Sequence, residues 1–121
     1  MMYYPESMVA TARGDVRRDV RLDTLSRVGT ALADEVRRHI LVRFLDGPSY
    51  PADLADELGE SRANVSNHLS CLRGCGLVLA TREGRQIRYE IADRKLERAL
   101  RLLCELELAV EHGHPDLDGR K

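Results

Sequence analysis

One part of the sequence constrains the fold most, because two short helical segments and a hairpin pattern follow one another without a linker. The first segment, 51–58, begins with proline, which a helix tolerates in its first turn. Ser61 then precedes a second helical segment at 62–73, and serine is a preferred N-cap. Residues 77–91 have the pattern of two strands around a turn at 82–85. This order predicts a mainly α fold with a β-hairpin wing, which is a winged helix-turn-helix.

Three further segments, 19–33, 34–44 and 93–112, repeat apolar residues at helical spacing. Asp34 and Asp93 are suited to cap the second and third of them. The first and last of these helices have apolar ridges that are too long to be covered by a domain of this size. We therefore expect a homodimer that pairs through them. The ridge residues are Val20, Leu22, Leu25, Val28, Ala31 and Leu32 in the first helix, and Leu96, Leu100, Leu103, Leu106 and Val110 in the last.

The length of 121 residues corresponds to one domain. Hydrophobic residues make up 43% of the chain and charged residues 32%, which excludes disorder throughout. We expect a loose extension at 1–18, a folded domain at 19–112 and a polar tail at 113–121. No apolar run approaches the roughly 18 residues of a membrane helix, so the chain is not expected to meet a membrane.

The cysteine count and the motif content narrow the function class. Three cysteines are an odd number, which argues against a disulfide framework. The N-terminus lacks a basic segment followed by an apolar stretch, so we expect a cytoplasmic protein whose thiols are free or bind metal. No Gly-rich phosphate loop or other recognisable catalytic motif is present, so we do not expect an enzyme.

The second helix of the predicted helix-turn-helix has small polar side chains opposite its apolar stripe. On a helical wheel Val65 marks the core side, and Asn67 and Ser70 lie opposite it. This face has no acid and suits base edges in the major groove of double-stranded DNA. The stretch 61–90 also contains five Arg against two Glu, although a single arginine can also be a solvated surface charge. The candidate DNA-binding residues are Ser61, Arg62, Asn64, Ser66, Asn67, His68, Arg82, Arg85 and Arg88. His68, on the flank of Cys71 and Cys75, can instead form structural hydrogen bonds or bind metal.

Cys71 and Cys75 form the clearest candidate for a metal site. Their spacing of four residues places both sulfurs on one flank of the predicted second helix. Two thiolates can share a soft ion such as Cd(II), Pb(II), Zn(II) or As(III), whereas Mg(II) and Ca(II) prefer oxygen. A pair with this spacing can instead be two small apolar residues packed beside the core. Two thiolates are an incomplete site, so a third ligand is expected.

Several motifs in order resemble the ArsR/SmtB family of metal-sensing repressors. Residues 31–41 look like the signature second helix of that family, 61–69 like its recognition helix and 76–89 like its wing. The resemblance covers 19–112. It implies a dimeric repressor that binds operator DNA without metal and is released when a thiophilic metal binds.

The resemblance is strongest, over residues 64–78, to the cadmium- and lead-sensing members of the family. Those proteins bind metal through two thiolates of this helix and a third Cys in the C-terminal tail, whose position falls on Asp116 in this chain. The chain instead has Cys104, which would complete a three-thiolate site suited to As(III), Pb(II) or Cd(II). Cys104 can also be a packing residue of the dimer interface. The other candidate ligands are His112, His114 and Asp116, which would favour Zn(II) or Cd(II).

Two alternative functions stay open from the sequence. The first keeps the winged-helix fold but replaces metal binding by oxidation of Cys71 and Cys75. The second is a helical dimer that serves as an interaction module without binding an operator. Thiolate–metal absorption with Cd(II) distinguishes the first from a metal sensor, and sequence-specific DNA binding excludes the second.

Overall fold

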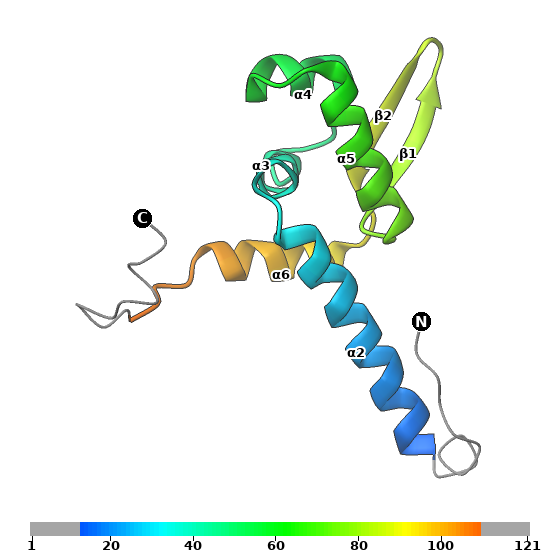
Figure 1. Ribbon diagram of the computed structural model, residues 1–121, viewed down its shortest axis with the longest axis vertical. Helices are drawn as coiled ribbons and strands as arrows, with labels where there is room; N and C mark the ends of the chain where they lie inside the picture. The colour runs from blue at the N-terminus through cyan, green and yellow to red at the C-terminus, as the bar shows by residue number, and fades with distance from the viewer. Residues whose placement is uncertain (1–12, 110–121) are drawn as a thin grey trace.

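The computed structural model describes residues 13–109, with side chains from residue 18 onward. It contains five helices and one antiparallel hairpin within that range, as predicted (Figure 1). The elements are α2 (Arg13–Leu32), α3 (Glu35–Phe44), α4 (Pro51–Leu58), α5 (Arg62–Gly74), β1 (Val78–Glu83), β2 (Gln86–Ile91) and α6 (Arg94–Cys104).

The core lies among α3, α4, α5 and the base of the hairpin. Each of these three helices turns one apolar side inward, while α2 extends away from the group (Figure 1). The buried apolar residues are Ala31, Ile40, Leu41, Phe44, Leu54, Ala55, Val65, Leu69, Leu72, Leu77, Val78, Tyr89 and Leu100. The recognition-type helix α5 is therefore held on its inner side only, and its outer side is open.

The turn between α4 and α5 is built by the predicted capping residues. Gly59 ends α4 with φ of 69°, a left-handed conformation that glycine adopts without steric cost. The hydroxyl of Ser61 accepts a hydrogen bond of 3.0 Å from the backbone N–H of Asn64 and so caps α5. The helix-turn-helix predicted from 51–73 is confirmed.

The hairpin is longer and its turn tighter than the sequence pattern predicts. β1 pairs with β2 from Val78 opposite Ile91 to Glu83 opposite Gln86, so the turn is only two residues long. Gly84 has φ of 61°, as tight two-residue hairpins require. Ser49 and Tyr89 exchange two backbone hydrogen bonds of 3.0 and 2.9 Å. These bonds fix the hairpin to the segment that leads into α4.

Both outer helices differ in length from the prediction. α2 begins at Arg13, inside the expected loose extension. The prediction missed this part of the helix because residues 13–18 lack apolar residues at helical spacing. α6 ends at Cys104 instead of near 112, and the N–H of Glu105 bonds back to carbonyls of its last turn. Leu106 beyond it is exposed, since this chain alone offers its apolar side no surface.

The predicted apolar ridges of α2 and α6 are only partly covered in the single chain. Ala31 and Leu100 are buried, and Val28, Leu32 and Leu96 pack against the core. Leu25 is 66% exposed, and Val20, Leu22 and Leu103 are exposed as well; Leu102, beside the predicted ridge of α6, is 62% exposed. Burying such side chains is favourable by about 25 cal/mol per Å² of apolar surface. These two helices are therefore the available faces for a second copy. None of the helices that the structure describes is long and apolar enough to cross a membrane.

Candidate functional site

The outer face of α5 carries the predicted polar surface. Arg62, Ser66 and Asn67 are exposed, whereas Val65 and Leu69 on the opposite side are fully buried. The helix presents an amide, a hydroxyl and a guanidinium to solvent without an acid on its exposed face. Such a surface can donate to and accept from base edges in a major groove.

Five of the predicted DNA-binding residues have side-chain partners within the chain, and two of them, Ser61 and Asn64, lie at the start of α5. The side-chain amide of Asn64 donates a hydrogen bond of 2.7 Å to Glu60 Oε1, and the residue is half-buried. The hydroxyl of Ser61 is used as the N-cap of α5. Asn64 would have to give up Glu60 to bind a base, so Arg62, Ser66 and Asn67 are the better placed residues.

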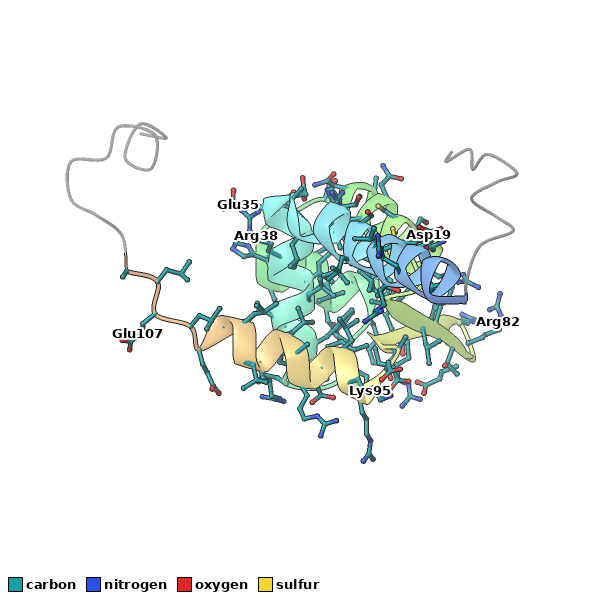
Figure 2. The ribbon with its side chains drawn as sticks, turned by 90° about the horizontal axis from the view of Figure 1, so that it is seen from below. Asp19, Glu35, Arg38, Arg82, Lys95 and Glu107 are labelled. Atoms are coloured by element: carbon teal, nitrogen blue, oxygen red, sulfur yellow. The ribbon has the colours of Figure 1, made fainter. Side chains whose placement is uncertain are left out.

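The three arginines of the wing differ in their surroundings. Arg85 lies in the turn and Arg82 just before it, and both are exposed. Arg82 points outward in Figure 2 and donates a hydrogen bond of 3.2 Å to the carbonyl of Gly84. Arg88 is only 35% exposed and lies 3.3 Å from Glu83 and 3.4 Å from Glu90. Two carboxylates already neutralise Arg88, so the wing offers Arg82 and Arg85 for phosphate contacts.

The same Glu83 connects the wing to α4. Tyr50, the N-cap residue of α4, donates its hydroxyl to Glu83 Oε1 at 2.7 Å. This hydrogen bond raises the pKa of Tyr50, since a phenolate would lose the donor and face a carboxylate. The contact connects β1 of the hairpin to the N-terminal end of α4.

His68 lies on the inner flank of α5 and not on its exposed face. Its side chain is 17% exposed, with Nε2 3.6 Å from Asp34 Oδ2 and Nδ1 3.4 Å from Arg37 Nη1. Asp34 caps α3, and the backbone N–H of Arg37 is the main reason that its pKa lies below the ordinary value, with His68 adding to the effect. These contacts agree with the expected structural hydrogen bonding of His68, and its contact with DNA stays a prediction.

Cys71 lies on this inner flank of α5, and Cys75 is the C-cap residue that follows the helix. Both thiols are free and half-buried, one helical turn apart. Arg27 of α2 reaches toward the backbone carbonyl of Cys75, with Nη1 at 3.5 Å from the oxygen. An ion pair of 2.8 Å with Asp23 raises the pKa of Arg27. The thiol pair is thus accessible to a small ion and lies where α5 meets α2.

The structure does not bring Cys104 to the thiol pair within one chain. Cys104 is exposed at the end of α6 that lies away from α5 (Figure 1). Among residues 13–109, no three His, Cys, Asp or Glu side chains gather closely enough to hold a metal ion. His112, His114 and Asp116 lie outside the described residues. Within the described residues of one chain, the structure therefore gives Cys71 and Cys75 no third ligand.

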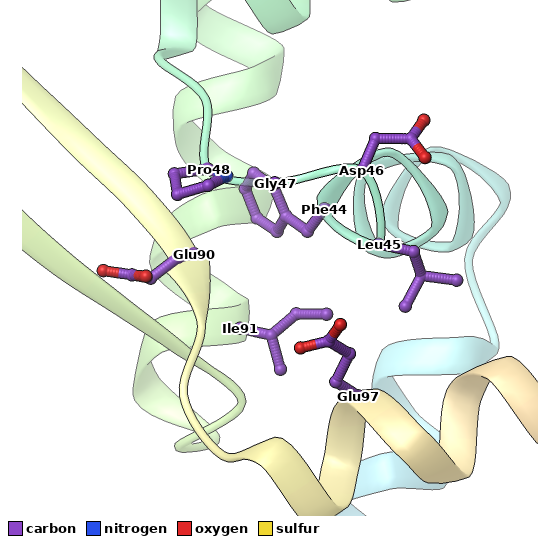
Figure 3. Close-up of a pocket in the computed structure, with 8 residues that line it drawn as sticks. All are labelled: Phe44, Leu45, Asp46, Gly47, Pro48, Glu90, Ile91 and Glu97. Carbon is purple, nitrogen blue, oxygen red and sulfur yellow. The ribbon is translucent and has the colours of Figure 1, made fainter.

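A hollow of about 230 Å³ lies elsewhere, between the end of α3 and the start of α6 (Figure 3). Its lining includes Asp46, Glu90 and Glu97 and no basic side chain. Figure 3 shows the Asp46 and Glu90 carboxylates pointing away from the centre and Glu97 lying near Ile91. None of its lining residues belongs to α5 or the thiol pair.

Comparison with known proteins agrees with this geometry. A family described as "Bacterial regulatory protein, arsR family" matches residues 34–79. The transcriptional regulator CmtR of Mycobacterium tuberculosis is 58% identical over 97 residues, which are 80% of this chain and 82% of that protein. The chain belongs to the ArsR family.

Solved structures of other proteins support the assignment to the ArsR family. The NMR structure of the cadmium metal-sensor CmtR from Mycobacterium tuberculosis aligns with a TM-score of 0.60 and 60% identity, covering 75% of this chain and 94% of that one. The homodimeric winged helix-turn-helix DNA-binding domain of Mb0332 from Mycobacterium bovis aligns with a TM-score of 0.70 and 32% identity, covering 80% and 87%. The fold is a winged helix-turn-helix.

Proposed function

We propose that this chain is a metal-responsive transcriptional repressor and not an enzyme. It binds operator DNA in the metal-free state, and a thiophilic metal ion releases it. One observation carries the proposal: Cys71 lies on α5 and Cys75 is its C-cap residue, and the same helix presents Arg62, Ser66 and Asn67 to solvent. The cytoplasm, which keeps thiols reduced, is the compartment in which this pair can serve as a metal ligand.

The proposed dimer forms through α2 and α6. Their exposed leucines, among them Leu25 and Leu102, support it, as does the homodimeric domain of Mb0332. A two-fold dimer presents two copies of α5 to DNA, so the operator is pseudo-palindromic. Cys104 lies beside the exposed Leu103 on the proposed pairing face of α6. It is therefore our preferred third ligand, supplied by a second copy, with His112, His114 and Asp116 as the alternatives.

The effector metal follows from the donor atoms. Three thiolates favour Cd(II), Pb(II) or As(III), whereas a His or Asp as third ligand shifts the preference toward Zn(II) or Cd(II). Cd(II) is common to both sets, and CmtR is a cadmium metal-sensor. Cd(II) is therefore the first ion to test, followed by Pb(II), Zn(II) and As(III). These soft ions bind the negatively charged sulfur of a thiolate in preference to the oxygen of water.

Selection from random duplex DNA followed by binding in the presence and absence of Cd(II) tests this function. We expect one enriched pseudo-palindrome that the metal-free protein binds and that Cd(II) releases. Failure to enrich any sequence would favour the interaction module. Release by an oxidant such as diamide, with no thiolate–Cd(II) absorption, would favour the thiol redox switch.

The first prediction is that α5 contacts bases and the wing contacts phosphates. Asn67→Ala removes an amide that suits adenine, so it should cost about 1–3 kcal/mol and relax specificity at one base pair. Arg85→Ala removes a charge near the wing turn, so it should weaken all sequences alike and reduce the salt slope by about one. Affinities for a panel of single-base operator variants at several salt concentrations measure both effects. Identical profiles for the two variants would contradict the assignment.

A further inference from the structure

Arg37 joins three helices at the inner flank of α5. Its Nε and Nη2 donate hydrogen bonds of 3.2 and 2.8 Å to the carbonyls of Ala31 and Thr30. Those carbonyls belong to the last turn of α2, and the Thr30 carbonyl also accepts a hydrogen bond of 3.3 Å from the N–H of Ala33. Its Nη1 lies 3.4 Å from His68 Nδ1 on α5. One guanidinium therefore connects the C-terminal end of α2, the first turn of α3 and α5.

The donor and acceptor roles of His68 follow from its neighbours. A guanidinium has only donors, so Nδ1 accepts from Arg37 and the ring proton lies on Nε2. That proton faces the Asp34 carboxylate at 3.6 Å. The ring thus has a partner on each side, both from the segment that follows α2.

The thiol pair lies between two links from α5 to α2. His68 is one turn before Cys71, and its link runs through Arg37. At the other end, Arg27 of α2 approaches the carbonyl of Cys75 at 3.5 Å. A change in the position of either sulfur therefore acts on a helix segment that is held to α2 at both ends.

We propose that His68 and Arg37 are positioning residues that couple the thiol pair to the orientation of α5 for DNA. This inference rests on the proposed function. In the metal-free protein the Arg37–His68 contact holds α5 against α2, the proposed dimer helix, and so sets the spacing of the two recognition helices. Metal binding at Cys71 and Cys75 favours a conformation in which this contact is weakened. The interaction free energy of the contact then differs between the metal-free and the metal-bound conformation, and coupling requires such a difference.

Two substitutions at His68 test the contact with little change in size. His68→Asn keeps an acceptor near the position of Nδ1, whereas His68→Leu removes it. We expect His68→Leu to reduce the ratio of operator affinities without and with Cd(II) by about tenfold, within the range seen for coupling residues. His68→Asn should restore most of that ratio. A residue that served only folding would lower the melting temperature without changing the ratio.

Arg37→Met is the second variant, and Arg43→Met is its matched control. Arg43 also lies on α3 and forms an ion pair, 2.8 Å from Glu57, but the pair connects α3 to α4 and not to α5. Arg37→Met should reduce the affinity ratio about as much as His68→Leu, whereas Arg43→Met should leave it within about twofold. Linkage adds a check, because the ratio of Cd(II) affinities without and with operator must fall by the same factor.

The outcomes separate this inference from the proposed function. If the unsubstituted protein binds its operator and Cd(II) does not release it, the proposed function fails and the inference with it. If the unsubstituted protein switches normally and both His68→Leu and Arg37→Met switch with the same ratio, only the inference is overturned. A reduced ratio in Arg43→Met as well would also overturn it, because the effect would then be a general weakening of α3.

Discussion

Leu25→Glu should convert the protein from a dimer to a monomer and abolish operator binding. Leu25 is the most exposed apolar residue of α2, and we place it in the proposed interface. A carboxylate buried there without a partner costs about 3 kcal/mol or more in each copy. Two copies together raise the dissociation constant of the dimer by about four powers of ten. Sedimentation at micromolar concentration measures the change, and anisotropy measures the loss of operator binding.

Val42→Glu is the matched control for this prediction. Val42 is 51% exposed on α3, so the substitution also replaces an exposed apolar side chain by a carboxylate, but outside α2 and α6. This variant should stay dimeric and bind the operator normally. A dimeric Leu25→Glu variant would place the interface elsewhere. A monomeric unsubstituted protein would contradict the two-fold operator model.

Cys71→Ser or Cys75→Ser should abolish metal-driven release while leaving operator binding within about threefold. Serine is close in size to cysteine, and both residues lie on the flank of α5 and not on its exposed face. A hydroxyl does not ionise near neutral pH and so cannot replace a thiolate for a soft ion. Operator affinity with and without Cd(II) measures both properties. Release in the double variant equal to that of the unsubstituted protein would exclude the thiol pair as the metal site.

Cys104→Ser is the discriminating third variant. If Cys104 of a second copy is the third ligand, this variant should bind the operator normally and lose most of its affinity for Cd(II). If Cys104 only packs in the dimer interface, Cd(II) binding should persist and dimer stability should fall by about 1 kcal/mol. Substitutions at His112, His114 and Asp116 should then reduce Cd(II) affinity instead.

Capping and turn residues made the helix-turn-helix predictable from the sequence. Asp34, Gly59 and Ser61 are short-range signals, and each forms the local contact that its residue type favours. The outer face of α5 was also predictable from nearby residues, because the spacing of Val65 and Leu69 identifies the buried side of the helix. Local chemistry of this kind does not depend on the rest of the fold.

Interactions between elements distant in sequence were not predictable. The inward position of His68 depends on Arg37, which lies 31 residues earlier in the chain. The pairing of Arg88 with Glu83 depends on the strand register, which the expected turn at 82–85 placed differently. α6 ends at Cys104, although the apolar spacing continues to Leu106 and Val110. Periodicity contains none of this information, because it describes one element at a time.

A Cd(II) titration of the operator complex, followed in one sample by thiolate–metal absorption and by DNA anisotropy, tests the central claim most directly. If metal binding at Cys71 and Cys75 causes release, absorption and loss of anisotropy should rise together and saturate at the same ratio of metal to protein. The Cys71→Ser, Cys75→Ser double variant should show neither change. Saturating absorption with the operator still bound, or release without any thiolate absorption, would contradict the account.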